Sequence, residues 1–71
     1  MLNRVLIADD HALVREGIGI LIARGGFSVV AEASNGQEAL THASSHQPDM
    51  AVLDKPGFAA VVDKVKATLA A

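Results

Sequence analysis

The sequence lacks every residue type that would stabilise a very small protein through covalent or thiolate–metal links. Its 71 residues include no cysteine, so neither disulfides nor a thiolate zinc site can contribute. Chains shorter than about 70–80 residues rarely build a stable core without such help or a partner. Tryptophan and tyrosine are also absent, and Phe27 and Phe58 are the only phenylalanines. We expect one domain over residues 1–71, with a core of valine, isoleucine, leucine and alanine.

Long apolar runs and basic clusters are missing too. No apolar run approaches the roughly 20 residues of a membrane helix, and the N-terminus does not have the basic region, apolar core and cleavage site of a signal peptide. The formal net charge is −2, with no cluster of lysine and arginine, which argues against nucleic acid or a membrane as a partner. We therefore expect a cytoplasmic location.

Apolar residues, by contrast, are abundant. They make up 51% of the chain, and the mean hydropathy is +0.34, which is high for so short a soluble chain. A small core cannot hide all of this surface. The composition therefore predicts apolar surface that a second subunit covers.

Two apolar runs end on carboxylates. Val5–Ala8 leads into Asp9 and Asp10, and Met50–Leu53 leads into Asp54. Short continuous apolar runs are typical of strands buried in parallel sheets, and ligands bind outside the carboxyl ends of such strands. The sequence thus predicts a concentrated acidic site at one sheet edge.

The pattern between these runs predicts the element order β-α-β-α-β-α. We expect a helix over His11–Arg24, capped by Asp9 or Asp10, with Leu13, Val14, Gly17, Ile18, Leu21 and Ile22 on one face. A strand over 27–33, a helix capped by Asn35 with Glu38 in a capping-box variant, and a strand over 49–54 follow. The last helix is expected over 58–69, with Phe58, Val61, Val62, Val65 and Leu69 inward. Connections of this length predict parallel strands with right-handed crossovers.

Four motifs carry a resemblance to a known family: Val5–His11, Leu13–Gly17, Ala33–Leu40 and Gln47–Asp54. In order and spacing they closely resemble the receiver domain of bacterial two-component response regulators, in the subclass that precedes a helix-turn-helix output domain. The resemblance covers residues 4–54. It implies a flavodoxin-like fold, here shortened to a three-stranded parallel sheet in the order 2-1-3.

The resemblance also implies a site and partners. Asp54 is the implied phosphoacceptor, with a histidine kinase or a small phosphodonor as the phosphoryl source, and Mg²⁺ is implied at Asp9, Asp10 and Asp54. Carboxylates, water and phosphate are the ligands that Mg²⁺ prefers. A bound metal would offset the repulsion between a carboxylate and a phosphoryl group.

After Asp54 the resemblance breaks. Lys55-Pro56 resembles the end of the family's fifth strand, joined directly to the third; alternatively, Pro56-Gly57 is the turn that follows the phosphoacceptor. Both alignments leave out the fourth strand with its hydroxyl residue and helix, and no output domain follows, so we expect no DNA binding. Lys55 is a candidate phosphate contact. It adjoins Asp54, however, and neighbouring strand residues point to opposite faces, so a solvated side chain or one that pairs with another chain is the favoured interpretation.

His42 and His46 have the i,i+4 spacing of a helical metal pair, but no third ligand is evident, and solvated histidines are the simpler interpretation. Gly25-Gly26 and Asn35-Gly36 match no phosphate-loop pattern and are read as helix boundaries.

We therefore expect a phosphoacceptor receiver module rather than a self-contained enzyme, because no general base or substrate pocket is visible. The alternative is an inert structural or dimerising receiver fragment. In either case the strand over 49–54 would be a sheet edge. We expect a homodimer, formed by pairing of these edges or by exchange of the last helices.

Overall fold

A computed structural model describes residues 3–70, apart from the side chains of Lys55 and Pro56. The elements follow in the order β1 (Arg4–Ala8), α1 (Ala12–Arg24), β2 (Ser28–Ala33), α2 (Gly36–His46), β3 (Met50–Leu53), α3 (Lys55–Phe58) and α4 (Val62–Ala70). The three strands form one parallel sheet in the order β2-β1-β3. This confirms the predicted fold class and strand order.

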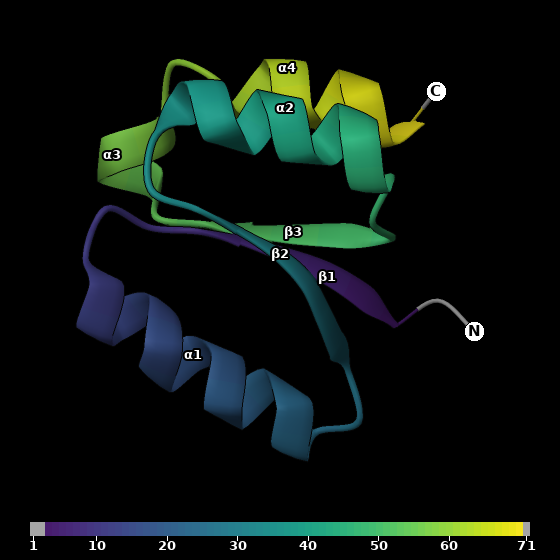
Figure 1. Ribbon diagram of the computed structural model, residues 1–71. Coiled ribbons are helices and arrows are strands. Elements are labelled where there is room, and N and C mark those ends of the chain that lie inside the picture. Colours follow the sequence, from purple (N-terminus) through teal and green to yellow (C-terminus); the bar gives the residue numbers. More distant parts are fainter. Residues whose placement is uncertain (1–2, 71) are drawn as a thin grey trace.

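The helices lie on both faces of the sheet (Figure 1). Helices α2 and α4 pack side by side on one face, and α1 covers the other. The core cluster lies on the α2–α4 face and consists of Leu6, Ala8, Ala33, Ala39, Ala43, Phe58 and Val65. Small alanines on α2 allow that helix to approach the sheet closely. None of the helices in the described residues has the length and apolarity needed to cross a membrane.

Strand β1 is the centre of the sheet, as its uninterrupted apolar sequence predicts. Val5, Leu6, Ile7 and Ala8 are each at most 1% exposed. The first residue of β1, Arg4, also bonds to the segment that precedes β3. The Arg4 N–H donates to Asp49 Oδ2 at 2.9 Å, and Arg4 Nη1 donates to the Gln47 carbonyl at 3.0 Å. Strand β3 pairs only with β1 in the described sheet and is therefore an edge, as predicted.

The start of α1 differs from the prediction. His11 is the N-cap, and it makes no side-chain capping bond. Neither Asp9 nor Asp10 occupies that position, because the Asp9 carboxylate instead accepts a hydrogen bond from the His11 N–H at 2.8 Å. The predicted apolar face of α1 is also only partly inward: Ile18 and Ile22 are half-buried, whereas Leu13 is 83% and Leu21 67% exposed.

The start of α2 matches the predicted capping-box variant. The Glu38 N–H donates to Asn35 Oδ1 at 2.9 Å, and Glu38 Oε1 accepts from the Ser34 N–H at 2.8 Å and from the Ser34 hydroxyl at 2.9 Å. These two hydrogen bonds from Ser34 lower the pKa of Glu38 below its ordinary value of 4.5, because they stabilise the charged form.

We expect this cap to make stability depend on pH. A carboxyl group whose pKa is lower in the folded state stabilises the fold above pH 4.5 and loses that effect as the pH falls through its folded value. The melting temperature should thus drop more for the wild type than for Glu38→Gln between about pH 5 and pH 3, since glutamine does not titrate. Equal drops, or a Glu38 pKa at its ordinary value in an NMR titration, would contradict this assignment.

The predicted last helix is two helices in the structure. The single turn of α3 ends at Phe58, and α4 begins at Val62. The Val61 N–H donates to the Phe58 carbonyl at 3.0 Å, a tight turn that reorients the chain once the Phe58 ring is buried. Phe58 and Val65 are buried, and Val61 and Leu69 pack against the core, as expected. Val62, which we predicted to be inward, is only half-buried and lies outside that cluster.

Candidate functional site

Two neighbouring strands deliver the acidic residues to one edge of the sheet. The Asp9 N–H donates to the Ala33 carbonyl at 3.0 Å, and the Asp54 N–H donates to the Ala8 carbonyl at 2.9 Å. Both bonds continue the strand ladders by one residue. The backbone positions of Asp9 and Asp54 are therefore set by the sheet itself rather than by a loop.

Asp9 is the most firmly held of the acidic residues. It is 6% exposed, and its Oδ1 accepts the hydrogen bond from the His11 N–H. Its carbonyl accepts from Arg15 Nη1 at 2.7 Å, and the same guanidinium lies 3.3 Å from Glu32 Oε1 on β2. Arg15 of α1 thus bonds to the end of β1 and also to β2. These bonds fix the loop that contains Asp10.

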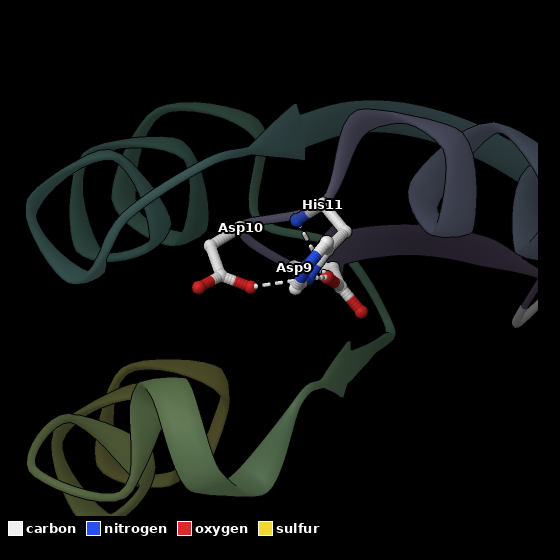
Figure 2. Close-up of side chains that lie close together, drawn as sticks. All are labelled: Asp9, Asp10 and His11. Carbon is white, nitrogen blue, oxygen red and sulfur yellow. Dashed lines mark hydrogen bonds and ion pairs between the residues drawn. The ribbon is translucent and has the colours of Figure 1, made fainter.

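Asp10 and His11 are the exposed part of the cluster (Figure 2). His11 Nδ1 lies 3.0 Å from Asp10 Oδ1 and 3.8 Å from Asp9 Oδ1. The Asp10 side chain is 57% and the His11 side chain 75% exposed. Since an ionised carboxylate only accepts hydrogen bonds, the imidazole donates from Nδ1 in this arrangement.

Asp54 approaches Asp10 across Gly57. The backbone N–H groups of Gly57 and Phe58 donate to the Asp54 carbonyl at 3.1 and 3.0 Å, which folds α3 back over the sheet edge. A Cβ atom at Gly57 would lie 3.6 Å from Asp54 Oδ2 and 3.9 Å from Asp10 Oδ2. Gly57 thus lies close to both carboxylates, and a side chain there would be in van der Waals contact with each of them.

Within residues 3–70, Asp9, Asp10 and His11 form the only group of three or more potential metal ligands whose atoms lie within 4.8 Å of one another. Asp54 is not part of this group. The assignment of Asp9, Asp10 and Asp54 as one metal site stays a prediction, supported by the position of Asp54 beside Asp10. His11 received no role in the sequence analysis, although its place directly after the acidic pair was a signal for it.

The chemistry of these donors suits Mg²⁺. Three carboxylates offer hard oxygen ligands, and the exposure of Asp10 leaves room for the water molecules that Mg²⁺ retains. An acidic cluster consistent with a divalent metal ion is thus present.

Two other candidates lie away from this cluster or outside the described atoms. The side chain of Lys55, the candidate phosphate contact, lies outside the described residues. The ring centroids of His42 and His46 are 5.2 Å apart, and the ring planes are inclined to each other by 57°. The Nδ1 atom of His46 is buried and has no hydrogen-bond partner. Neither histidine belongs to a group of three ligands within the described part of the chain.

The fold and this acidic edge define a receiver-like α/β module, and comparison with known proteins identifies the family. The model of the response regulator receiver domain matches residues 5–55, well over half of the chain. The protein belongs to the response regulator receiver family.

Its relatives include transcriptional regulators and a chemotaxis protein. A putative transcriptional regulator of Pseudomonas aeruginosa is 47% identical over 53 residues, which are 75% of this chain and 26% of that protein. The chemotaxis protein CheY of Bacillus subtilis is 43% identical over 54 residues, 76% of this chain and 45% of CheY. The transcriptional regulatory protein PdtaR of Mycobacterium tuberculosis is 43% identical over 52 residues, 73% of this chain and 25% of PdtaR. The chain thus spans between a quarter and just under half of these relatives.

Proposed function

We propose that the chain is a phosphoacceptor module of a two-component phosphorelay, in which Asp54 accepts a phosphoryl group. The observation that carries the proposal is the nearness of the Asp54 and Asp10 carboxylates to one point, since a Cβ at Gly57 would lie 3.6 Å from Asp54 Oδ2 and 3.9 Å from Asp10 Oδ2. Asp54 ends β3 beside the acidic pair that ends β1, which is where an open parallel sheet binds ligands.

In this reaction a carboxylate oxygen of Asp54 attacks the phosphorus of the donor. A new O–P bond forms, and the bond from phosphorus to its leaving group breaks. The leaving group departs with the bonding electron pair, as an imidazole from a histidine kinase or as a carboxylate from an acyl phosphate. A carboxylate nucleophile needs no general base, because no proton has to be removed from it during the attack. The protein contributes position, because the sheet holds Asp54 beside the acidic pair.

Asp9, Asp10 and Asp54 would hold Mg²⁺, which supplies positive charge against the oxygens of the transferring group. Asp9 is suited to fix the site because it is buried and braced by Arg15 through its carbonyl. Asp10 is suited to exchange water because its side chain is largely exposed. His11, bonded to Asp10, orients that carboxylate.

The test is transfer from a small phosphodonor. Incubating the chain with Mg²⁺ and an acyl phosphate should add one phosphoryl group in intact-mass measurements, slowly or with a short lifetime, because no hydroxyl donor from a fourth strand is present to bind the phosphoryl oxygens. Loss of one such donor costs on the order of 3 kcal/mol in electrostatic sites. Asp54→Asn should abolish labelling, and Asp63→Asn, an exposed carboxyl on α4, should leave it unchanged. Labelling that persists in Asp54→Asn would contradict the proposal.

A second candidate function is that of an inert, dimerising receiver fragment. The observation that favours it is the exposed apolar surface: Leu13, Ile20, Leu21 and Met50 are each 38% or more exposed. Absence of any Asp54-dependent labelling, together with a stable dimer, would support this function over phosphotransfer.

A further inference from the structure

The imidazole of His11 is placed where it can take part in holding a metal ion. His11 is the N-cap residue of α1, a position whose side chain commonly accepts a hydrogen bond from the helix, yet it makes no such bond. Its backbone N–H donates to Asp9 Oδ1 at 2.8 Å, and its ring bonds to the Asp10 carboxylate (Figure 2). The imidazole is therefore part of the acidic cluster rather than of the helix cap.

The distances from His11 Nδ1 to both carboxylates suit a shared ion. This atom lies 3.0 Å from Asp10 Oδ1 and 3.8 Å from Asp9 Oδ1. Two ligand atoms bound tetrahedrally to Zn²⁺ at about 2.1 Å lie about 3.4 Å apart, midway between these two distances. The ligand atoms of the three residues all lie within 4.8 Å of one another. Rotation of the exposed side chains of Asp10 and His11 is enough to bring them onto one ion with Asp9.

The hydrogen bond between His11 and Asp10 marks the position that such an ion would take. The imidazole donates from Nδ1 to the ionised carboxylate, so both ligand atoms already face the same point. When an ion binds there, a metal–nitrogen bond replaces the N–H bond at Nδ1, and the neutral ring carries its proton on Nε2 instead. The His11 side chain is 75% exposed, so water can carry this proton from one nitrogen to the other.

A nitrogen ligand changes which cation the cluster favours. Imidazole suits Zn²⁺, Ni²⁺ and Cu²⁺, whereas carboxylates and water suit Mg²⁺. Asp9 and Asp10 combined with Asp54 form an all-oxygen set of ligands. Combined with His11 they form a mixed set of one nitrogen and two carboxylates, and within the described residues this mixed set is the one whose ligand atoms lie close together.

We propose that His11 is a metal ligand that determines the selectivity of the site. With Asp9 and Asp10 it binds a divalent transition-metal ion such as Zn²⁺ more tightly than the cluster binds Mg²⁺. This inference rests on the proposed function in taking Asp9 and Asp10 as metal ligands, and it adds a means of regulation. Both sets of ligands use these two carboxylates, so Zn²⁺ bound on the His11 side competes with the Mg²⁺ that transfer to Asp54 needs.

Calorimetric titrations with ZnCl₂ and with MgCl₂ test this assignment. Asparagine keeps a hydrogen-bond donor for Asp10 but has no imidazole nitrogen, so His11→Asn should lower the Zn²⁺ affinity at least about tenfold and the Mg²⁺ affinity much less. Asp54→Asn should show the reverse pattern, with a larger loss for Mg²⁺ than for Zn²⁺. His42→Asn, which removes an imidazole from α2, is the matched control and should bind both ions like the wild type.

NMR of the imidazole nitrogens gives a second readout. Adding Zn²⁺ should shift the Nδ1 resonance of His11 and leave those of His42 and His46 in place. Equal losses of Zn²⁺ and Mg²⁺ affinity in His11→Asn would overturn the proposal, and so would a loss of Zn²⁺ affinity in His42→Asn, which would place the zinc on α2. A Zn²⁺ loss in His11→Asn without a Mg²⁺ loss in Asp54→Asn would support this proposal and contradict the metal site of the proposed phosphotransfer.

Discussion

Replacing Phe58 by alanine is expected to remove a large part of the free energy of unfolding at 25 °C. Phe58 is the largest fully buried side chain, at 2% exposure, and it holds α3 and the turn into α4 against the sheet. Removing a buried phenylalanine side chain costs about 3–5 kcal/mol. At roughly 0.05–0.15 kcal/mol per residue, the whole chain has about 4–10 kcal/mol of stability. Urea denaturation followed by circular dichroism measures the loss.

Phe27 is the matched control for this experiment, since the same substitution removes the same atoms from a different environment. Phe27 lies between α1 and β2 and is 38% exposed, so Phe27→Ala should cost clearly less than Phe58→Ala. Equal losses for the two variants would show that the Phe58 ring does not contribute a core contact.

The second large effect is expected in metal binding. Asp54→Asn should weaken Mg²⁺ binding at least about tenfold, because it removes one of three negative charges that a divalent cation would offset. Isothermal titration calorimetry with MgCl₂ measures the affinity. Asp63→Asn removes a carboxylate of α4 away from the site and should bind Mg²⁺ like the wild type. Unchanged affinity in Asp54→Asn would show that the metal is held without Asp54, by Asp9, Asp10 and His11.

The strands and the acidic edge could be predicted because their signals are local. Val5–Ala8 is apolar without interruption, and Asp9 and Asp54 directly follow their strands, so strand ends alone place both carboxylates at one edge. The details that failed depend on the rest of the molecule. The Asp9 side chain bonds to the His11 N–H instead of capping α1, and no sequence pattern distinguishes these two uses of an aspartate.

The outward part of α1 was unpredictable for a related reason. Leu13 and Leu21 have the spacing of a core face, but the width of the sheet decides how many sides of a helix are covered. Similarly, the periodicity of residues 58–69 is continuous, whereas burial of Phe58 requires the turn that separates α3 from α4. Periodicity reports which residues are apolar, and only the surrounding layers determine which of them are covered.

The central place of β1 has a consequence for how the chain folds as it is synthesised. Of the three described strands, β1 is synthesised first and needs both of the others as neighbours, and its hydrogen bond to Asp49 spans 45 residues. Closing so long a loop costs chain entropy, and this cost arises before the contacts that offset it can form. Strand β1 can therefore pair with β2 early, but it gains its second partner only after β3 (Met50–Leu53) has been made. Until then its other edge is a free template for strands of neighbouring chains.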